Sequence, residues 1–265
     1  MIITITNLHN NTQLYDVLLF CGIINKLLRN YRMKIKGPLI KGRFVDRPNR
    51  FLVIVKIKDK YVKSHLPDPG RLKEILTPGR IVFLRKESYT TNRKTKYTTV
   101  LTDVNGELVS LISTLPNQFI RECIELNYLS FLDGLSIKKQ EIKSGKHRFD
   151  FLLTDKKNMQ FYLEVKSVTY VENKVARFPD AITERGTRHV NALSDLVNKG
   201  FQAGIIFVIQ RSDANIFQPM WDRDSKFCDA LYNAKKCGVS IWCIKSRLSK
   251  ADMTFISEIP INLEP

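Results

Sequence analysis

Two acidic residues and a lysine near the middle of the chain have the types and spacing of groups that hold a metal ion. Asp150 lies in the segment Arg148–Leu153, and Glu164 and Lys166 lie in the segment Phe161–Val168. Both segments are short and rich in aromatic and branched apolar residues, which predicts two β-strands. Side chains two positions apart in a strand point to the same side, so Glu164 and Lys166 are expected to share one face.

The two strands are expected to pair as a hairpin. The spacer at residues 154–160 is polar and turn-like, so Asp150 should lie close to Glu164. Two carboxylates on neighbouring strands are ligands that Mg²⁺ accepts together with water and phosphate oxygens. A lysine beside the ion can orient an attacking water or neutralise charge on a phosphate. The pattern predicts metal-dependent phosphodiester cleavage; the alternative is that Glu164 and Lys166 form a solvated pair on the strand surface.

The charge of the chain favours a polyanionic partner. A formal net charge of +17 on 265 residues attracts nucleic acid more readily than an anionic membrane. Residues 34–110 carry 18 Lys+Arg and 7 Asp+Glu, hence +11, whereas residues 111–265 carry 22 and 18, hence +4. A generally basic proteome or a solvated surface would not concentrate the charge in one segment. The first half of the folded protein is therefore the predicted docking surface.

Several other classes of protein are disfavoured. The five cysteines form no C-x-x-C pair and the four histidines are scattered, so neither a disulfide framework nor a zinc site is expected. The chain contains no P-loop and no G-x-G-x-x-G, which disfavours nucleotide hydrolysis and dinucleotide redox chemistry. The uncharged run at residues 17–25 is too short to span a bilayer and lacks a basic leader. A cytoplasmic protein without a membrane partner is expected.

The N-terminal half is predicted to contain an appendage and a small barrel. Residues 1–33 form the appendage, with a short amphipathic helix between Leu14 and Leu28. Residues 34–113 form the barrel, because short strands alternate with turns and with one brief helical run. The strands are expected at residues 51–57, 61–66, 81–85, 97–104 and 107–112, and the helical run at residues 71–76. This basic, strand-rich segment predicts an OB-like domain that binds nucleic acid.

The C-terminal half, residues 114–265, is predicted to be a three-layer α/β/α domain with a mixed sheet. A first helix follows Asn117 as its N-cap, and Gly200 and Gly238 end two later helices. The continuous apolar run at residues 203–209 predicts a strand covered by helices on both faces. The expected strands are residues 137–142, 149–153, 161–168, 203–209 and, last, 239–244; the later helices are residues 180–198 and 222–237.

Further candidates surround the acidic pair. Glu122 lies on the first helix of the C-terminal domain and is an additional acid. Arg185, Arg188 and His189 are spaced i, i+3 and i+4, so they share a helix face that can hold phosphates; the alternative is an ion pair with a neighbouring acid. The predicted nucleic-acid contacts of the barrel are Arg43, Arg47, Arg50, Arg71, Arg93, Lys94 and Lys96.

Five segments together carry a resemblance to a known family. They are Arg50-Phe51-Leu52, the run from His65 to Leu72, the run from Arg148 to Leu153, Glu164-Val165-Lys166, and the run from Phe178 to His189. In these segments the chain resembles the sugar fermentation stimulation protein family (SfsA). The resemblance implies an N-terminal OB-like domain, a C-terminal restriction-endonuclease-like domain of the PD-(D/E)XK type, and DNA binding without marked sequence preference. It also implies a link to the regulation of sugar use, notably of maltose.

The resemblance assigns roles to individual residues. Asp150, Glu164 and Lys166 match the nuclease signature, with Glu122 as the extra acid, and Phe149 replaces the proline of that signature. Mg²⁺ or Mn²⁺ is then held by Asp150, Glu164 and the carbonyl of Val165. Two functions stay open: a metal-dependent nuclease, and a non-catalytic DNA-binding regulatory factor linked to sugar (maltose) metabolism. RNA as a partner and the oligomeric state, a homodimer included, stay open as well.

Overall fold

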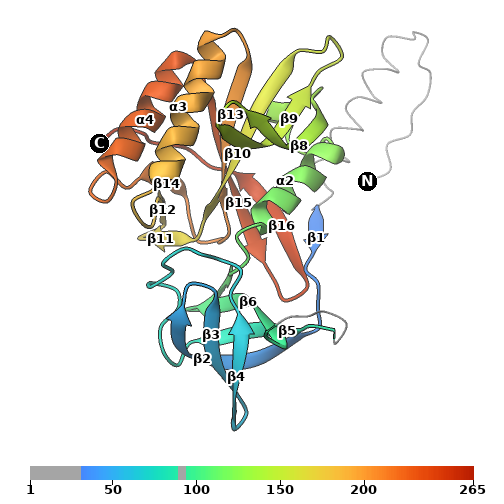
Figure 1. The fold of residues 1–265 in the computed structure, drawn as a ribbon, viewed down its shortest axis with the longest axis vertical. Helices are drawn as coiled ribbons and strands as arrows, with labels where there is room; N and C mark the ends of the chain where they lie inside the picture. Colours follow the sequence, from blue (N-terminus) through green and yellow to red (C-terminus); the bar gives the residue numbers. More distant parts are fainter. Residues whose placement is uncertain (1–30, 89–93) are drawn as a thin grey trace, which may run out of the picture. The chain divides into compact units, whose positions relative to one another are not determined.

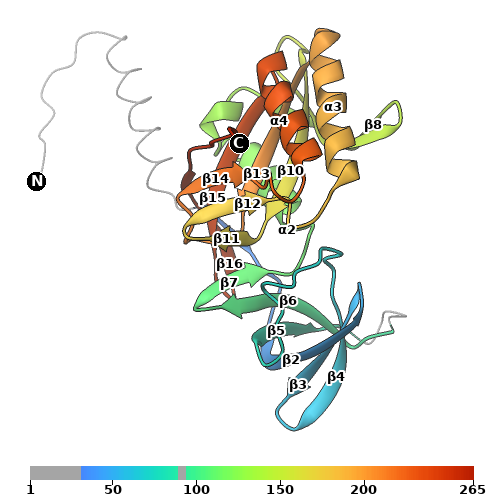
Figure 2. The same ribbon diagram turned by 90° about the vertical axis from the view of Figure 1, so that its left-hand side faces the viewer.

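The computed structural model describes residues 31–88 and 94–265. In this part the chain forms a strand-rich barrel and an α/β domain with a mixed sheet, as the sequence predicts (Figures 1 and 2). The amphipathic helix expected between Leu14 and Leu28 lies outside the described residues, and so does Arg93. Among the described residues, no helix combines the length and the apolar character needed to cross a bilayer.

Five strands close the barrel in the order β2-β3-β4-β6-β5, and β7 pairs with β6 outside the closed ring. β4 runs parallel to β6, and the other neighbours are antiparallel. The strands are β2 (Leu39–Asn49), β3 (Leu52–Ile57), β4 (Lys60–His65), β5 (Ile81–Lys86), β6 (Tyr97–Val104) and β7 (Glu107–Ser110). The predicted barrel is confirmed, but one of its five strands differs from the prediction. The sequence did not predict β2, and the strand expected at residues 107–112 is β7, which lies outside the closed barrel.

Local backbone chemistry explains one correct and one wrong prediction in the barrel. Asn105 and Gly106, with φ of 56° and 91°, make the predicted turn between β6 and β7, since both tolerate left-handed backbone. The expected helix at residues 71–76 is absent; Ile75 N and Leu76 N both donate to Leu72 O, which closes a single turn. Leu72 itself has φ of 53°, which no right-handed helix accommodates.

Arg47 on β2 fixes this non-helical segment. Its Nη1 donates to the carbonyls of Gly70 and Arg71, both at 2.7 Å. Its Nη2 donates to the carbonyls of Arg50 at 2.8 Å and Asp68 at 3.1 Å. The carbonyls of residues 70 and 71 thus accept from a side chain, which competes with the hydrogen bonds that would start a helix. Arg47 was predicted to contact nucleic acid; in this structure its guanidinium ties three stretches of backbone together.

The α/β domain is built on a seven-stranded sheet in the order β1-β16-β15-β13-β10-β9-β8. β10, β13 and β15 are parallel, and the remaining pairs are antiparallel, which makes the sheet mixed. The strands are β1 (Arg32–Lys34), β8 (Ser136–Ser144), β9 (His147–Thr154), β10 (Gln160–Val168), β13 (Gln202–Ile209), β15 (Ser240–Leu248) and β16 (Asp252–Glu258). A small second sheet contains β11 (Tyr170–Glu172), β12 (Val175–Phe178) and β14 (Ile216–Pro219).

Helices cover both faces of the large sheet. On one face, α3 (Glu184–Asn198) and α4 (Ser225–Cys237) pack over a core that includes Val190, Phe207 and Phe227. The other face carries α2 (Leu115–Glu125), which contacts β8 and β10 (Figure 1). The short η1 (Ser130–Leu132) places Phe131 against Trp242 of β15. β13 is buried along almost its whole length, as its apolar run predicts.

Several details of this domain differ from the predictions. α3 begins at Glu184 rather than at residue 180, because Thr183 caps it by accepting a hydrogen bond from Gly186 N at 3.1 Å. α2 begins at Leu115, so Asn117 lies inside the first turn rather than at the N-cap. Residues 239–244 are not the last strand, since β16 follows and pairs with β1 from the beginning of the described chain.

Arg47→Ala should lower the free energy of unfolding by roughly 2–3 kcal/mol, because four backbone carbonyls lose a charged donor. Urea denaturation measures this loss. Arg50→Ala is the matched control: its side chain is exposed, and its truncation should change stability by less than about 0.5 kcal/mol. Equal stability of the two variants would show that Arg47 does not hold the segment.

Candidate active site

The acidic site forms where β9 and β10 separate. The two strands pair from Gln160–Thr154 to Leu163–Phe151, which confirms the predicted hairpin. At the next position of β9, the carboxylate of Asp150 lies beside the β10 backbone, and its Oδ2 accepts a hydrogen bond from Val165 N at 2.7 Å. The side chain of Asp150 thus accepts the N–H of Val165 at the point where the backbone hydrogen bonds between β9 and β10 stop.

Glu164 is buried and is held by two donors. Its side chain accepts a hydrogen bond from Lys166 Nζ at 2.5 Å, so the two residues share a face as predicted. The same oxygen, Oε1, lies 2.7 Å from His189 Nδ1 on α3. The second oxygen, Oε2, is buried and has no hydrogen-bond partner within the described part of the chain. A buried carboxylate oxygen left in this state needs a positive charge or a donor.

The pKa values of the two carboxyl groups are shifted in opposite directions. Burial, and then the negative charge of Glu164, raise the pKa of Asp150 from 3.8 to about 7. Burial alone would raise the pKa of Glu164 too, but the charge of Lys166 and the hydrogen bond with His189 outweigh it and lower this pKa. Near neutral pH, Glu164 therefore stays ionised while Asp150 is close to its titration midpoint.

These residues fit a divalent cation. A cation between the carboxylates would satisfy Oε2 of Glu164 and remove the repulsion that holds Asp150 partly protonated. The described residues contain no cluster of three or more His, Cys, Asp or Glu side chains arranged around one ion. Two carboxylates completed by a backbone carbonyl, water and substrate phosphate suit Mg²⁺ or Mn²⁺ better than Zn²⁺, which favours nitrogen and sulfur ligands.

From α2, Asn117 reaches the acidic site. The sequence predicted this residue as the N-cap of the helix. Its side chain hydrogen-bonds the carboxylate of Asp150. Glu122, the predicted extra acid, follows five residues later and is turned about 140° around the helix axis from Asn117. Glu122 has Arg121 Nη2 3.9 Å from its carboxylate. The helical pattern of the sequence did not predict the contact between Asn117 and Asp150.

The three residues predicted to share a face of α3 separate into two groups. His189 is buried against Glu164, whereas Arg185 and Arg188 are exposed. Arg188 forms an ion pair with Glu184 at 3.5 Å, the alternative that the sequence left open. The position of His189 next to a carboxylate was not predicted, although its helical spacing placed it at the edge of the arginine face.

The predicted basic residues of the barrel differ in how freely they can contact a ligand. Arg43 Nη1 donates to the carbonyl of Gly79 at 3.1 Å, and the donors of Arg47 are engaged as described above. Arg43 is nevertheless exposed, as are Arg50, Arg71, Lys94 and Lys96, for which no engaged side-chain donor is described. Arg50 and Arg71 lie near one another, because Arg47 bonds the carbonyls of both.

A hollow of 340 Å³ is lined by residues of the barrel and of the α/β domain. One wall is the barrel segment from Asp68 to Leu72, and the opposite wall is the segment from Arg177 to Thr183 that leads into α3. Ser167, which follows Lys166 on β10, also lines it. Leu72 N donates to Asp180, and Arg223 bonds both Glu74 (3.5 Å) and the Asp180 carbonyl (2.9 Å). The run from His65 to Leu72 and the run from Phe178 to His189 therefore meet here.

Comparisons with known proteins agree with the fold of a barrel followed by an α/β domain. The family pattern described as "Sugar fermentation stimulation protein RE domain" matches residues 114–252, and "SfsA N-terminal OB domain" matches residues 45–111. A sugar fermentation stimulation protein homolog of Clostridium tetani is 40% identical over 87% of this chain and its own whole length. A homolog from Clostridium botulinum is 38% identical with the same coverage. The solved structure of Pyrococcus furiosus SfsA in complex with Ca²⁺ is 28% identical, with a TM-score of 0.80, and covers 87% of this chain and 98% of the other.

Asp150→Asn should stabilise the metal-free protein above pH 7. The folded pKa of Asp150, about 7, exceeds the usual 3.8, so ionisation costs folding stability as pH rises between these values. The variant should be more stable than the original by up to roughly 4 kcal/mol at pH 8 in EDTA, and equal near pH 4. Thermal unfolding across this pH range measures the difference. A constant difference at all pH values would contradict the raised pKa.

Proposed function

The chain belongs to the sugar fermentation stimulation protein family, and on that premise we propose that it binds DNA and hydrolyses phosphodiester bonds with Mg²⁺ or Mn²⁺. The observation that carries the proposal is the buried, unsatisfied Oε2 of Glu164 beside an Asp150 whose pKa is raised to about 7. The Ca²⁺ bound to the related archaeal protein supports a divalent cation in this family. Asp150, Glu164 and the carbonyl of Val165 are the proposed ligands.

Several residues of the chain have separate roles in the proposed hydrolysis. When bound, a divalent cation neutralises the charge that develops on the scissile phosphate. Lys166 has three N–H donors, of which Glu164 accepts one, so the others can orient the attacking water or hold a phosphate oxygen. Asn117 and Val165 N fix the carboxylate of Asp150, and His189 fixes that of Glu164. Water adds to phosphorus as the phosphate ester bond breaks.

The DNA backbone is proposed to cross from the barrel to the acidic site. Arg50 and Arg71 form the barrel end of this path, with Lys94 and Lys96 as further contacts, and Arg185 and Arg188 continue it at the start of α3. Charge contacts of this kind carry no sequence information, which suits binding without marked sequence preference. RNA would satisfy the same contacts.

The alternative is a DNA-binding regulatory factor of sugar (maltose) metabolism that does not cut. The excess of eleven positive charges in residues 34–110 favours it, because this charge supports binding whether or not the acidic pair is used. The two functions share a surface and differ only in the chemistry at Asp150 and Glu164.

Purified protein should cut single-stranded, duplex or branched DNA with Mg²⁺ or Mn²⁺ and not in EDTA. Asp150→Asn and Glu164→Gln should each lower the rate at least about a hundredfold, because either change removes a ligand charge. Both variants should retain DNA affinity in EDTA, measured by fluorescence anisotropy. Binding without cutting, equal in the original and the variants, would favour the regulatory alternative.

His189→Ala should raise the Mg²⁺ concentration needed for half-maximal cutting by roughly 10–100-fold, because the hydrogen bond that orients Glu164 is lost. His189→Asn is the matched control, since its amide nitrogen can replace Nδ1 and should restore most of the metal affinity. Arg188→Ala, on the exposed face of α3, should leave the metal requirement unchanged. A drop in rate without any change in the metal requirement would contradict this positioning role.

A further inference from the structure

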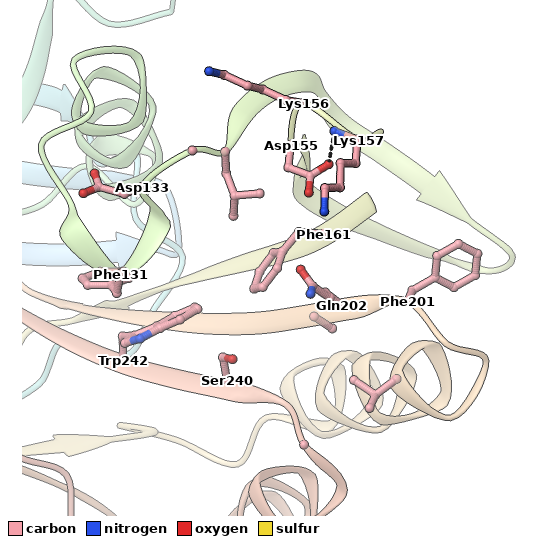
Figure 3. Close-up of a pocket in the computed structure, with 15 residues that line it drawn as sticks. Phe131, Asp133, Asp155, Lys156, Lys157, Phe161, Phe201, Gln202, Ser240 and Trp242 are labelled. Carbon is pink, nitrogen blue, oxygen red and sulfur yellow. Dashed lines mark hydrogen bonds between the residues drawn. The ribbon is translucent and has the colours of Figure 1, made fainter. Parts of the chain in front are cut away.

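A second hollow, of 720 Å³, lies at the other end of the parallel strands and takes no part in the proposed chemistry (Figure 3). It is lined by the first residues of β10, β13 and β15, by η1, and by the turn between β9 and β10. Phe161, which lines it, precedes Glu164 by three positions on β10, so it lies about 10 Å away along the strand and on the opposite face. A small ligand in this hollow could not reach the acidic pair.

One wall of the hollow is aromatic. Phe131 and Trp242 stack with ring centroids 4.7 Å apart, and Phe161 lies 6.0 Å from Trp242 with an interplanar angle of 32°. Gly204 makes this possible: a Cβ there would lie 2.7 Å from the Trp242 ring and 2.9 Å from the Phe161 ring. Phe131 and Trp242 are only half-buried, so the wall stays open to a planar group from solvent.

The remaining walls combine apolar residues, among them Leu135 and Val197, with polar ones, and they provide one inward-pointing cation. Figure 3 shows the Lys157 side chain extending toward Phe161 and Gln202, whereas Lys156 points away. The carboxylate of Asp155 accepts hydrogen bonds from Lys157 N and Met159 N, both at 2.8 Å, so it is used to shape the turn. Neither lysine forms an ion pair with any residue that the structure describes. The ammonium group of Lys157 is therefore available to an anion.

We propose that this hollow binds a nucleoside monophosphate unit, with the base against the aromatic wall and the phosphate at Lys157. Gln202 and Ser240 line the same hollow and offer donors and acceptors to the edge of the base. The volume lies within the range of pockets that hold small ligands, which are also largely aromatic with a few polar groups. A free nucleotide and the terminal nucleotide of a DNA strand share this chemistry. The proposal does not depend on cutting.

Trp242 provides a direct readout, because Trp221 and Trp242 are the only two tryptophans of the chain. In a Trp221→Phe background, deoxynucleoside monophosphates should quench Trp242 fluorescence in a saturable way, with excitation beyond the absorption of the bases. Short oligonucleotides titrated in parallel distinguish a strand end from a free nucleotide. If the oligonucleotide saturates the quench at the lower concentration, the site is assigned to strand ends. If the mononucleotide does so, the site is assigned to free nucleotide.

The two neighbouring lysines give a matched pair of variants. Lys157→Ala should weaken binding roughly tenfold, as the loss of one charged hydrogen bond predicts, and Lys156→Ala should change it less than about twofold. Asp150→Asn should leave the quench intact, so failure of the metal site and failure of this site are separable. No saturable quench at millimolar nucleotide, equal affinity for the nucleoside without phosphate, or equal effects of the two lysine variants would overturn the proposal.

Discussion

A buried carboxylate, Glu164, beside a half-buried one, Asp150, is the constraint on which the α/β domain depends. Neither carboxylate can be withdrawn from water without partners, and those partners come from different parts of the chain. α2 supplies Asn117, α3 supplies His189, and β10 supplies Val165 N and Lys166. The helices on the two faces of the sheet are therefore tied to it by polar contacts at the site as well as by the apolar core.

The partners are distributed unequally, and this inequality prepares the site for a cation. Glu164 has two donors on one oxygen and none on the other, whereas Asp150 has donors but shares the positive charge of Lys166 with Glu164. The metal-free protein thus retains one buried carboxylate oxygen without a hydrogen-bond partner among the described residues. Such a site costs stability in the absence of metal and returns it on binding, because a ligand that binds only the folded state stabilises that state. The carboxylates of Asp150 and Glu164 therefore affect both the stability of the fold and the proposed binding of a cation.

The sequence predicted the part of the site that depends on local periodicity. Alternation along two short strands placed Glu164 and Lys166 on one face, and a polar spacer brought Asp150 to Glu164. The parts that failed depend on contacts between distant segments. Asn117 reaches Asp150 only because α2 crosses the sheet at this point, and His189 is turned inward by the packing of α3. Likewise, the pairing of β1 with β16 joins the two ends of the described chain, and no local pattern signals such a pairing.

The failed helix at residues 71–76 shows how the barrel is connected to the α/β domain. Local propensity favoured a helix there, but Arg47 takes the carbonyls that would begin it, and Asp180 takes the N–H of Leu72. The segment is held in a strained left-handed conformation at Leu72 by partners from both domains. A helix would have used the carbonyls of residues 70 and 71 internally, and the two domains would lack the connection that Arg47 and Asp180 make through this segment. Arg47 also holds the backbone carbonyls of Arg50 and Arg71, so these two exposed side chains extend from a fixed stretch of backbone.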